Sequence, residues 1–166
     1  MRIPVFVSCP TDLNPEQEIV RGYLFDWIEN NSLTAHTLGR SDYSRQSTLH
    51  EVLVLGKRCC GALVLGFEQM YSDKLFKKRG TSAESQVKGV SLPTPWNHLE
   101  AGIMYAQRIP LLIFREEGIS GGIFDSGTVD GFVHSMPSVE ELGKDPRTES
   151  MLQRWSGEVM NNYYNV

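Results

Sequence analysis

Short apolar runs alternate along the chain with longer segments whose apolar residues recur every three or four positions. The short runs are rich in β-branched and aromatic residues and lack polar alternation, a pattern typical of buried parallel strands. They predict strands over residues 3–8, 33–38, 61–67, 109–114 and 129–134. The helical spacing predicts helices over residues 15–30, from 47 or 48 to about 56, from 94 onward and from 145 onward.

Five such alternations predict an α/β fold whose open, mostly parallel sheet is covered by helices on both faces. We expect the strand order 2-1-3-4-5, and we expect residues 1–166 to form a single domain. Residues 68–93 interrupt the alternation with a charged segment that has no clear periodicity. An insertion of this length predicts a functional or mobile loop, or a short helix hidden within it.

Composition narrows the classes of partner. The chain has 16 Lys and Arg against 20 Asp and Glu, so it offers no basic tract for a phosphate backbone, and we expect no nucleic-acid partner. The basic cluster Lys74, Lys77, Lys78 and Arg79 is interpreted as a solvated loop. Three cysteines and four scattered histidines lack metal-ligand spacing, which predicts no metal site and a reduced setting. No apolar run is long enough to span a membrane, so we expect a soluble cytoplasmic protein with no membrane partner.

Candidate ligand-binding residues follow the ends of the predicted strands. In sheets of this kind ligands bind outside the carboxyl ends of the strands. The residues placed there are Ser8, Thr11, Asp12, Arg40, Asp42, Tyr43 and Phe67. The helix that starts at Thr94, with Pro95 in its first turn, opens onto the same edge. Trp96 and Glu100 lie four residues apart on one face of that helix, within reach of the first two loops.

Glu100 has two interpretations from its position alone. It is either a solvated glutamate stabilised by the helix dipole, or a packed carboxyl group beside the Trp96 indole. Packing would raise its pKa by desolvation, and the ring would be able to stack on a ligand base. Gly102 favours the packed interpretation, since glycine permits another element to approach closely. Glycine motifs for dinucleotides or nucleoside triphosphates do not occur in the sequence.

The segment around Glu100 resembles two known families. Trp96-Asn97-His98-Leu99-Glu100 is similar to the Trp-Cys-x-x-Glu element of Toll/interleukin receptor (TIR) domains, with Asn97 standing where that family often has Cys. Glu100-Ala101-Gly102 and the strand beginning Ile109-Pro110 resemble the corresponding stretch of nucleoside 2-deoxyribosyltransferases. Both resemblances imply a flavodoxin-like three-layer sandwich and make Glu100 the catalytic carboxylate at the anomeric carbon of a ribosyl group.

The TIR resemblance implies a glycohydrolase or cyclase that cleaves the nicotinamide N-glycosidic bond of NAD, in bacterial antiviral immune signalling. NAD would be the substrate, and no cofactor is expected. Two alternatives stay open: a nucleoside or nucleotide N-glycosidase or 2-deoxyribosyltransferase, and a non-enzymatic module that assembles with itself or binds a fused or separate sensor protein. The expected substrate-binding residues are Ser8, Thr11, Asp12, Arg40, Asp42, Tyr43, Phe67, Trp96 and Asn97.

Overall fold

Five parallel strands form the central sheet of the computed structural model, which describes residues 2–38, 47–131 and 133–165. The strand order is β2-β1-β3-β6-β7, and every neighbouring pair in it is parallel. The strands are β1 (Ile3–Ser8), β2 (Leu33–His36), β3 (Ala62–Gly66), β6 (Leu111–Arg115) and β7 (Val133–Ser135). The predicted α/β class, the flavodoxin-like sheet and the order 2-1-3-4-5 are confirmed, because β6 and β7 are the fourth and fifth strands of this sheet.

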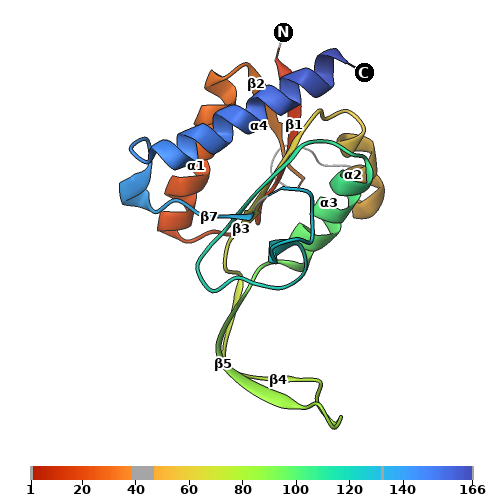
Figure 1. Cartoon of the computed structure of the whole chain (residues 1–166), viewed down its shortest axis with the longest axis vertical. Helices are drawn as coiled ribbons and strands as arrows, with labels where there is room; N and C mark the ends of the chain where they lie inside the picture. Colours follow the sequence, from red (N-terminus) through yellow and green to blue (C-terminus); the bar gives the residue numbers. More distant parts are fainter. Residues whose placement is uncertain (1, 39–46, 132, 166) are drawn as a thin grey trace.

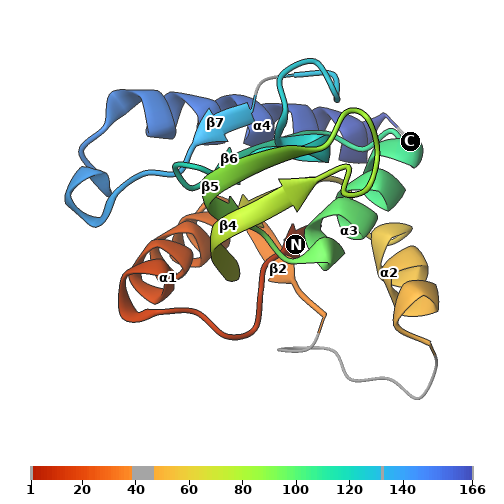
Figure 2. The ribbon, with the colours of Figure 1, turned by 90° about the horizontal axis from the view of Figure 1, so that it is seen from below.

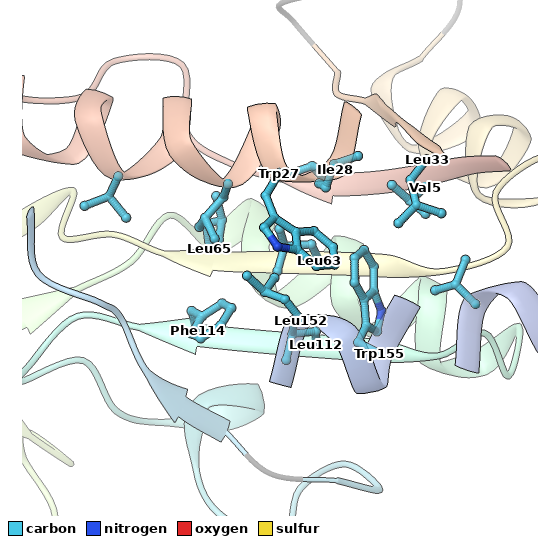
Figure 3. Packing of buried hydrophobic residues seen from close by; sticks show 14 of the residues in the cluster. Val5, Trp27, Ile28, Leu33, Leu63, Leu65, Leu112, Phe114, Leu152 and Trp155 are labelled. Carbon is cyan, nitrogen blue, oxygen red and sulfur yellow. The ribbon is translucent and has the colours of Figure 1, made fainter. Parts of the chain in front are cut away.

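Helices cover both faces of the sheet (Figure 1). The helices are α1 (Pro15–Asn30) and α4 (Pro146–Tyr164) on one face, and α2 (Thr48–Gly56) and α3 (Pro95–Ala106) on the other. Under α1 and α4, Trp27 and Trp155 pack against fully buried strand residues such as Leu63 (Figure 3). Under α2 and α3, Val52 and Met104 are fully buried in a second cluster. Two short 3-10 helices complete the fold, η1 (Gly122–Phe124) and η2 (Val139–Glu141).

Side-chain caps fix where the helices begin. Asn14 and Gln17 form a capping box at α1, and the Asp145 side chain accepts hydrogen bonds from the first turn of α4. At α3 the Thr94 hydroxyl accepts from the Trp96 amide at 3.3 Å, and Pro95 occupies the first helical position. The predicted start of α3 at Thr94 is therefore confirmed.

The last strand of the sheet lies later and is shorter than the sequence predicts. A strand was expected over residues 129–134, whereas β7 covers Val133–Ser135. Gly127 and Gly131 have φ values of 83° and 118°, which are turn conformations that an extended strand excludes. The turns delay the start of pairing with β6 until Val133.

The segment between β3 and α3 is a β-hairpin, here called the arm. It consists of β4 (Met70–Lys77) and β5 (Ser85–Leu92), which pair in antiparallel register and form a separate two-stranded sheet. Figure 1 shows the arm extending away from the sheet and helices, and Figure 2 shows its two strands side by side. Residues 70–92 thus form a hairpin of two strands, whereas a loop or a short helix was expected over residues 68–93. Much of the arm is solvent-exposed, so its strands lack the alternation of apolar and polar residues that marks a half-buried strand.

No helix in the described part of the chain is long and apolar enough to cross a membrane.

Candidate functional site

Ser8, Asn97 and Glu100 come together at the carboxyl edge of the sheet. Ser8 is the last residue of β1, while Asn97 and Glu100 lie three apart in the first two turns of α3. The Asn97 amide donates to the Ser8 hydroxyl at 2.8 Å, and the Ser8 hydroxyl donates to the Glu100 carboxylate. Three polar side chains from two elements are thus joined in one hydrogen-bonded chain, as the edge geometry predicted for Ser8 and Glu100.

Burial changes the acidity of Glu100. The residue is 8% exposed, and loss of water raises the pKa of its carboxyl group from 4.5 to about 7. The hydrogen bond from Ser8 acts in the opposite direction, since it stabilises the charged form. Glu100 is therefore a group that exchanges a proton near neutral pH, which is a property common among catalytic carboxyls.

Asn97 has an unpaired acceptor. The residue is completely buried, and its amide nitrogen also lies 3.4 Å from the Ser8 carbonyl oxygen. Its Oδ1 atom has no hydrogen-bond partner among residues 2–38, 47–131 and 133–165. Leaving a buried acceptor unsatisfied costs about 1–3 kcal/mol. Asn97 therefore has an acceptor that no described protein group uses, beside the Ser8 hydroxyl.

The buried face of α3 differs from the face that its leucine and isoleucine suggest. The buried residues are Asn97, Glu100, Ala101 and Met104, whereas Leu99 is 46% exposed. Trp96 is 41% exposed, so the packed carboxyl interpretation of Glu100 holds but the indole is not what buries it. The close approach expected at Gly102 does not occur, because no other element comes within 4 Å of the position that a Cβ atom would take there.

The other predicted binding residues are dispersed. Phe67 is fully buried in the core beneath α1 and α4, and Thr11 and Asp12 are exposed on the loop that leaves β1. Arg40, Asp42 and Tyr43 fall on residues 39–46, outside the described residues. Among the described candidates, Ser8 and Asn97 are the ones that hydrogen bonds connect to Glu100 or to each other.

A second polar network lies at the same edge of the sheet, and it was not predicted from the sequence. The buried Gln17 side chain donates to the Glu116 carboxylate at 2.9 Å and to the Glu68 carbonyl at 3.3 Å. Glu116 also accepts from the Glu68 amide, and Gln69 donates to the Asp12 carbonyl at 3.1 Å. The network fastens the base of the arm to α1 and β6. The capping-box pattern at Asn14 was the available signal, since it places Gln17 in the first turn of α1.

A large groove lies at the other end of the sheet. Its volume is about 1100 Å³, and it is lined by the end of α3, the start of β6 and one side of α4. His134 lies in its wall, and burial together with the nearby Arg154 charge lowers the pKa of that imidazole. The groove does not include Glu100. We place the candidate site on the Ser8–Asn97–Glu100 chain, because it carries the perturbed carboxyl group at the edge where such folds bind ligands. Within the described residues, no group of three or more His, Cys, Asp or Glu is placed to hold a metal ion.

The sequence matches no protein-family model and no curated protein. Its fold is similar to a metal-soaked Flv1 flavodiiron core from Synechocystis sp. PCC6803, with 10% identity and a TM-score of 0.49. That match covers 100% of this chain and 37% of the length of the other. A diflavin flavoprotein A3 from Nostoc sp. matches with 12% identity and a TM-score of 0.36, over 98% of this chain and 92% of the other.

These similarities correct one expectation. A site without a cofactor was predicted, whereas the similar structures are those of a flavodiiron core and a diflavin flavoprotein. That prediction is withdrawn.

The loop after β1 does not fit the phosphate of a flavin. Asn14 already accepts the Gln17 amide at the start of α1, where a phosphate would otherwise bind. The adjoining pocket of about 310 Å³ is lined by Asn14, Gln17 and three glutamates, Glu68, Glu116 and Glu117. The negative charges of these carboxylates would repel a phosphate group in this pocket. No step of the chemistry proposed below passes through a flavin.

Proposed function

We propose that this protein cleaves the nicotinamide–ribose bond of NAD, with Glu100 facing the ribosyl C1′. The main support is the Glu100 carboxyl, which is buried at the carboxyl edge of a parallel sheet and titrates near neutral pH. The resemblance of residues 96–100 to the TIR element also supports the proposal and suggests a signalling role. Asn97 stands where the TIR element often has Cys. In this protein the Asn97 side chain donates a hydrogen bond to the Ser8 hydroxyl.

The chemistry needs a carboxylate and little else at the reacting carbon. As the C1′–N bond breaks, its electron pair passes to the ring nitrogen, and the pyridinium becomes neutral nicotinamide. Positive charge then develops on the ribosyl carbon and ring oxygen, and the ionised Glu100 stabilises it. Water adds to C1′ and releases one proton, which gives ADP-ribose. Because the leaving group departs neutral, no general acid is required.

Ser8 and Asn97 are assigned as positioning residues. The Ser8 hydroxyl stabilises the ionised form of Glu100, and Asn97 orients that hydroxyl by donating to its oxygen. The direction of this hydrogen-bonded chain leaves the carboxylate as the final acceptor. It therefore favours the charge state that the proposed reaction uses.

Product analysis of the purified full chain tests this function. The protein is incubated separately with NAD and with a panel of ribonucleosides, deoxynucleosides and their monophosphates, and products are identified by mass spectrometry. We expect nicotinamide with ADP-ribose or its cyclic form from NAD. Release of bases from the nucleosides while NAD stays intact would contradict the proposal and assign the site to nucleoside chemistry.

The pH dependence of turnover reports the state of Glu100. Because the ionised carboxylate stabilises the transition state, kcat/KM is expected to rise with pH and to level off above about 7. Ser8→Ala removes the hydrogen bond that lowers the Glu100 pKa, so the midpoint is expected to move to higher pH. The measurement is a pH–rate profile of kcat/KM for both proteins. A midpoint that stays in place in Ser8→Ala would show that Ser8 does not act on the titrating group.

A further inference from the structure

The arm is a fixed projection of the fold. At its base the Gln69 amide donates to the Leu92 carbonyl at 2.9 Å, and Ser91 forms an isolated bridge with Ile119. The Glu68 amide is held by Glu116, as described above. Beyond this base, β4 and β5 pair with each other and with no other strand that the structure describes. The arm thus projects from the fold, with most of its residues exposed or half-buried (Figure 1).

The surface of the arm is unusual for an isolated ribbon. Met70, Tyr71 and Phe76 are 47%, 60% and 45% exposed, and Met70 and Phe76 lie on the opposite face from Tyr71. A two-stranded hairpin is marginally stable alone, and the outer edge of β4 has no partner among the described strands. Unpaired backbone groups beside exposed aromatic rings make such an edge a template for a further strand.

The charged residues of the arm indicate which partner its free edge can bind. The arm, residues 70–92, contains five of the 16 Lys and Arg residues and two of the 20 Asp and Glu residues. The rest of the chain therefore holds eleven basic and eighteen acidic residues. Within this positive arm, β4 carries both signs: Asp73 and Lys77 lie two residues before and two residues after Leu75. The edge of β4 is therefore complementary to a second, antiparallel copy of itself.

We propose that two copies of this chain associate through their arms, with the β4 edges paired antiparallel about Leu75. In this register Leu75 faces its own equivalent, Asp73 faces Lys77 of the second copy, and Lys74 faces Phe76. Each of the last two pairs occurs twice because the interface is two-fold symmetric. Lys74 already lies 5.1 Å from the Phe76 ring centroid within one strand, so these two side chains have compatible geometry.

The same arrangement accounts for the charged tip of the arm. Antiparallel pairing carries Lys78 and Arg79 along the second arm toward its base, where Glu68 and Glu117 are exposed. Four strands then form one continuous sheet, and the two free edges of β4 are removed. This inference does not depend on the proposed NAD chemistry, since it uses none of the residues assigned to that site.

Sedimentation equilibrium of the full chain tests the interface at low and high salt. We expect a concentration-dependent dimer whose dissociation constant rises with salt, because the pairs are exposed charges. Asp73→Lys and Lys77→Asp alone each place like charges opposite one another and are expected to weaken association at least about 10-fold. The combined swap Asp73→Lys/Lys77→Asp restores the opposite-charge pairs and is expected to return the dissociation constant to within about 3-fold of the original.

Lys144→Asp is the matched control, since it makes the same charge change at an exposed position away from the arm. It is expected to leave association nearly unchanged. A monomer at all concentrations would overturn the proposal, as would a dimer that neither single variant weakens. A random-sequence oligonucleotide is the second probe. If the protein is monomeric and binds the oligonucleotide through the arm lysines, the partner of the arm is a polyanion, and the proposal of a second copy is overturned.

Discussion

Glu100→Gln is expected to abolish NAD cleavage and at the same time to make the protein more stable. Glutamine keeps the size of the side chain but cannot carry the negative charge that faces the ribosyl carbon. Loss of one preorganised electrostatic group at a transition state typically costs 100-fold or more in turnover. We therefore expect at least a 100-fold fall in kcat, measured as nicotinamide release, with circular dichroism unchanged.

The stability gain follows from the raised pKa of Glu100. The folded protein holds the proton up to about pH 7, whereas an unfolded carboxyl releases it near 4.5. Stability that this group contributes below pH 4.5 is consequently lost as the pH rises toward 7. At pH 8 the buried charge costs about 3 kcal/mol of unfolding free energy. Glu100→Gln removes this cost and is expected to stabilise the protein by about 1–3 kcal/mol at pH 8, with a smaller gain at pH 5.

Urea unfolding of both proteins at pH 5 and pH 8 measures the effect. Glu16→Gln is the matched control, because Glu16 is an exposed glutamate in the first turn of α1. It is expected to leave turnover intact and to change stability little. Turnover by Glu100→Gln within a few-fold of the original would remove Glu100 from the mechanism, and an equal stability difference at both pH values would contradict the assigned pKa.

Gly66→Ala is expected to destabilise the fold by about 2–3 kcal/mol. Gly66 ends β3 beside the site, and a Cβ atom there would lie 2.4 Å from Cε1 of Phe124 and 2.8 Å from its Cζ. The Phe124 ring is fully buried among other side chains of η1 and α3, so it has little room to move. The expected result is a lower urea midpoint with an unchanged slope.

Gly102→Ala provides the contrasting control for Gly66→Ala. Gly102 lies in α3 with no atom of another element within 4 Å of the added Cβ, so alanine is expected to stabilise the helix by about 0.5–1 kcal/mol. Adding Phe124→Leu to Gly66→Ala is expected to recover part of the loss, since it removes the ring that the new methyl group meets. Additive losses in that double variant would exclude the steric explanation.

The sheet was predictable because its signals are local. The apolar runs of β1 and β3 are continuous, and their alternation with helices indicates a mostly parallel sheet. The edge position of Ser8 and the start of α3 at Thr94 followed from the same patterns. Glu100 was identified as a candidate because the edge rule and the motif resemblance both indicate the N-terminal part of α3.

The environment of Glu100 was not predictable in the same way. Hydrophobicity alone would turn Leu99 inward, whereas the fold turns Asn97 and Glu100 inward and pairs them with Ser8. That pairing joins residues 89 positions apart, so no local pattern contains it. The arm was missed for a related reason. Its strands satisfy their hydrogen bonds with each other and bury little, so the sequence carried no signal of a core-facing side.

The arm also has a consequence for how this fold diversifies. It enters after Gln69 and leaves at Leu92, and those two residues are joined by a backbone hydrogen bond of 2.9 Å. Excising the hairpin and closing the chain with a short turn would therefore require almost no rearrangement of β3 or α3, because the loop ends already meet. The backbone between Gln69 and Leu92 is therefore a site where an inserted segment can be replaced without changing the rest of the fold. Ribbons of different length or surface can be exchanged there while the strand order of the sheet is retained.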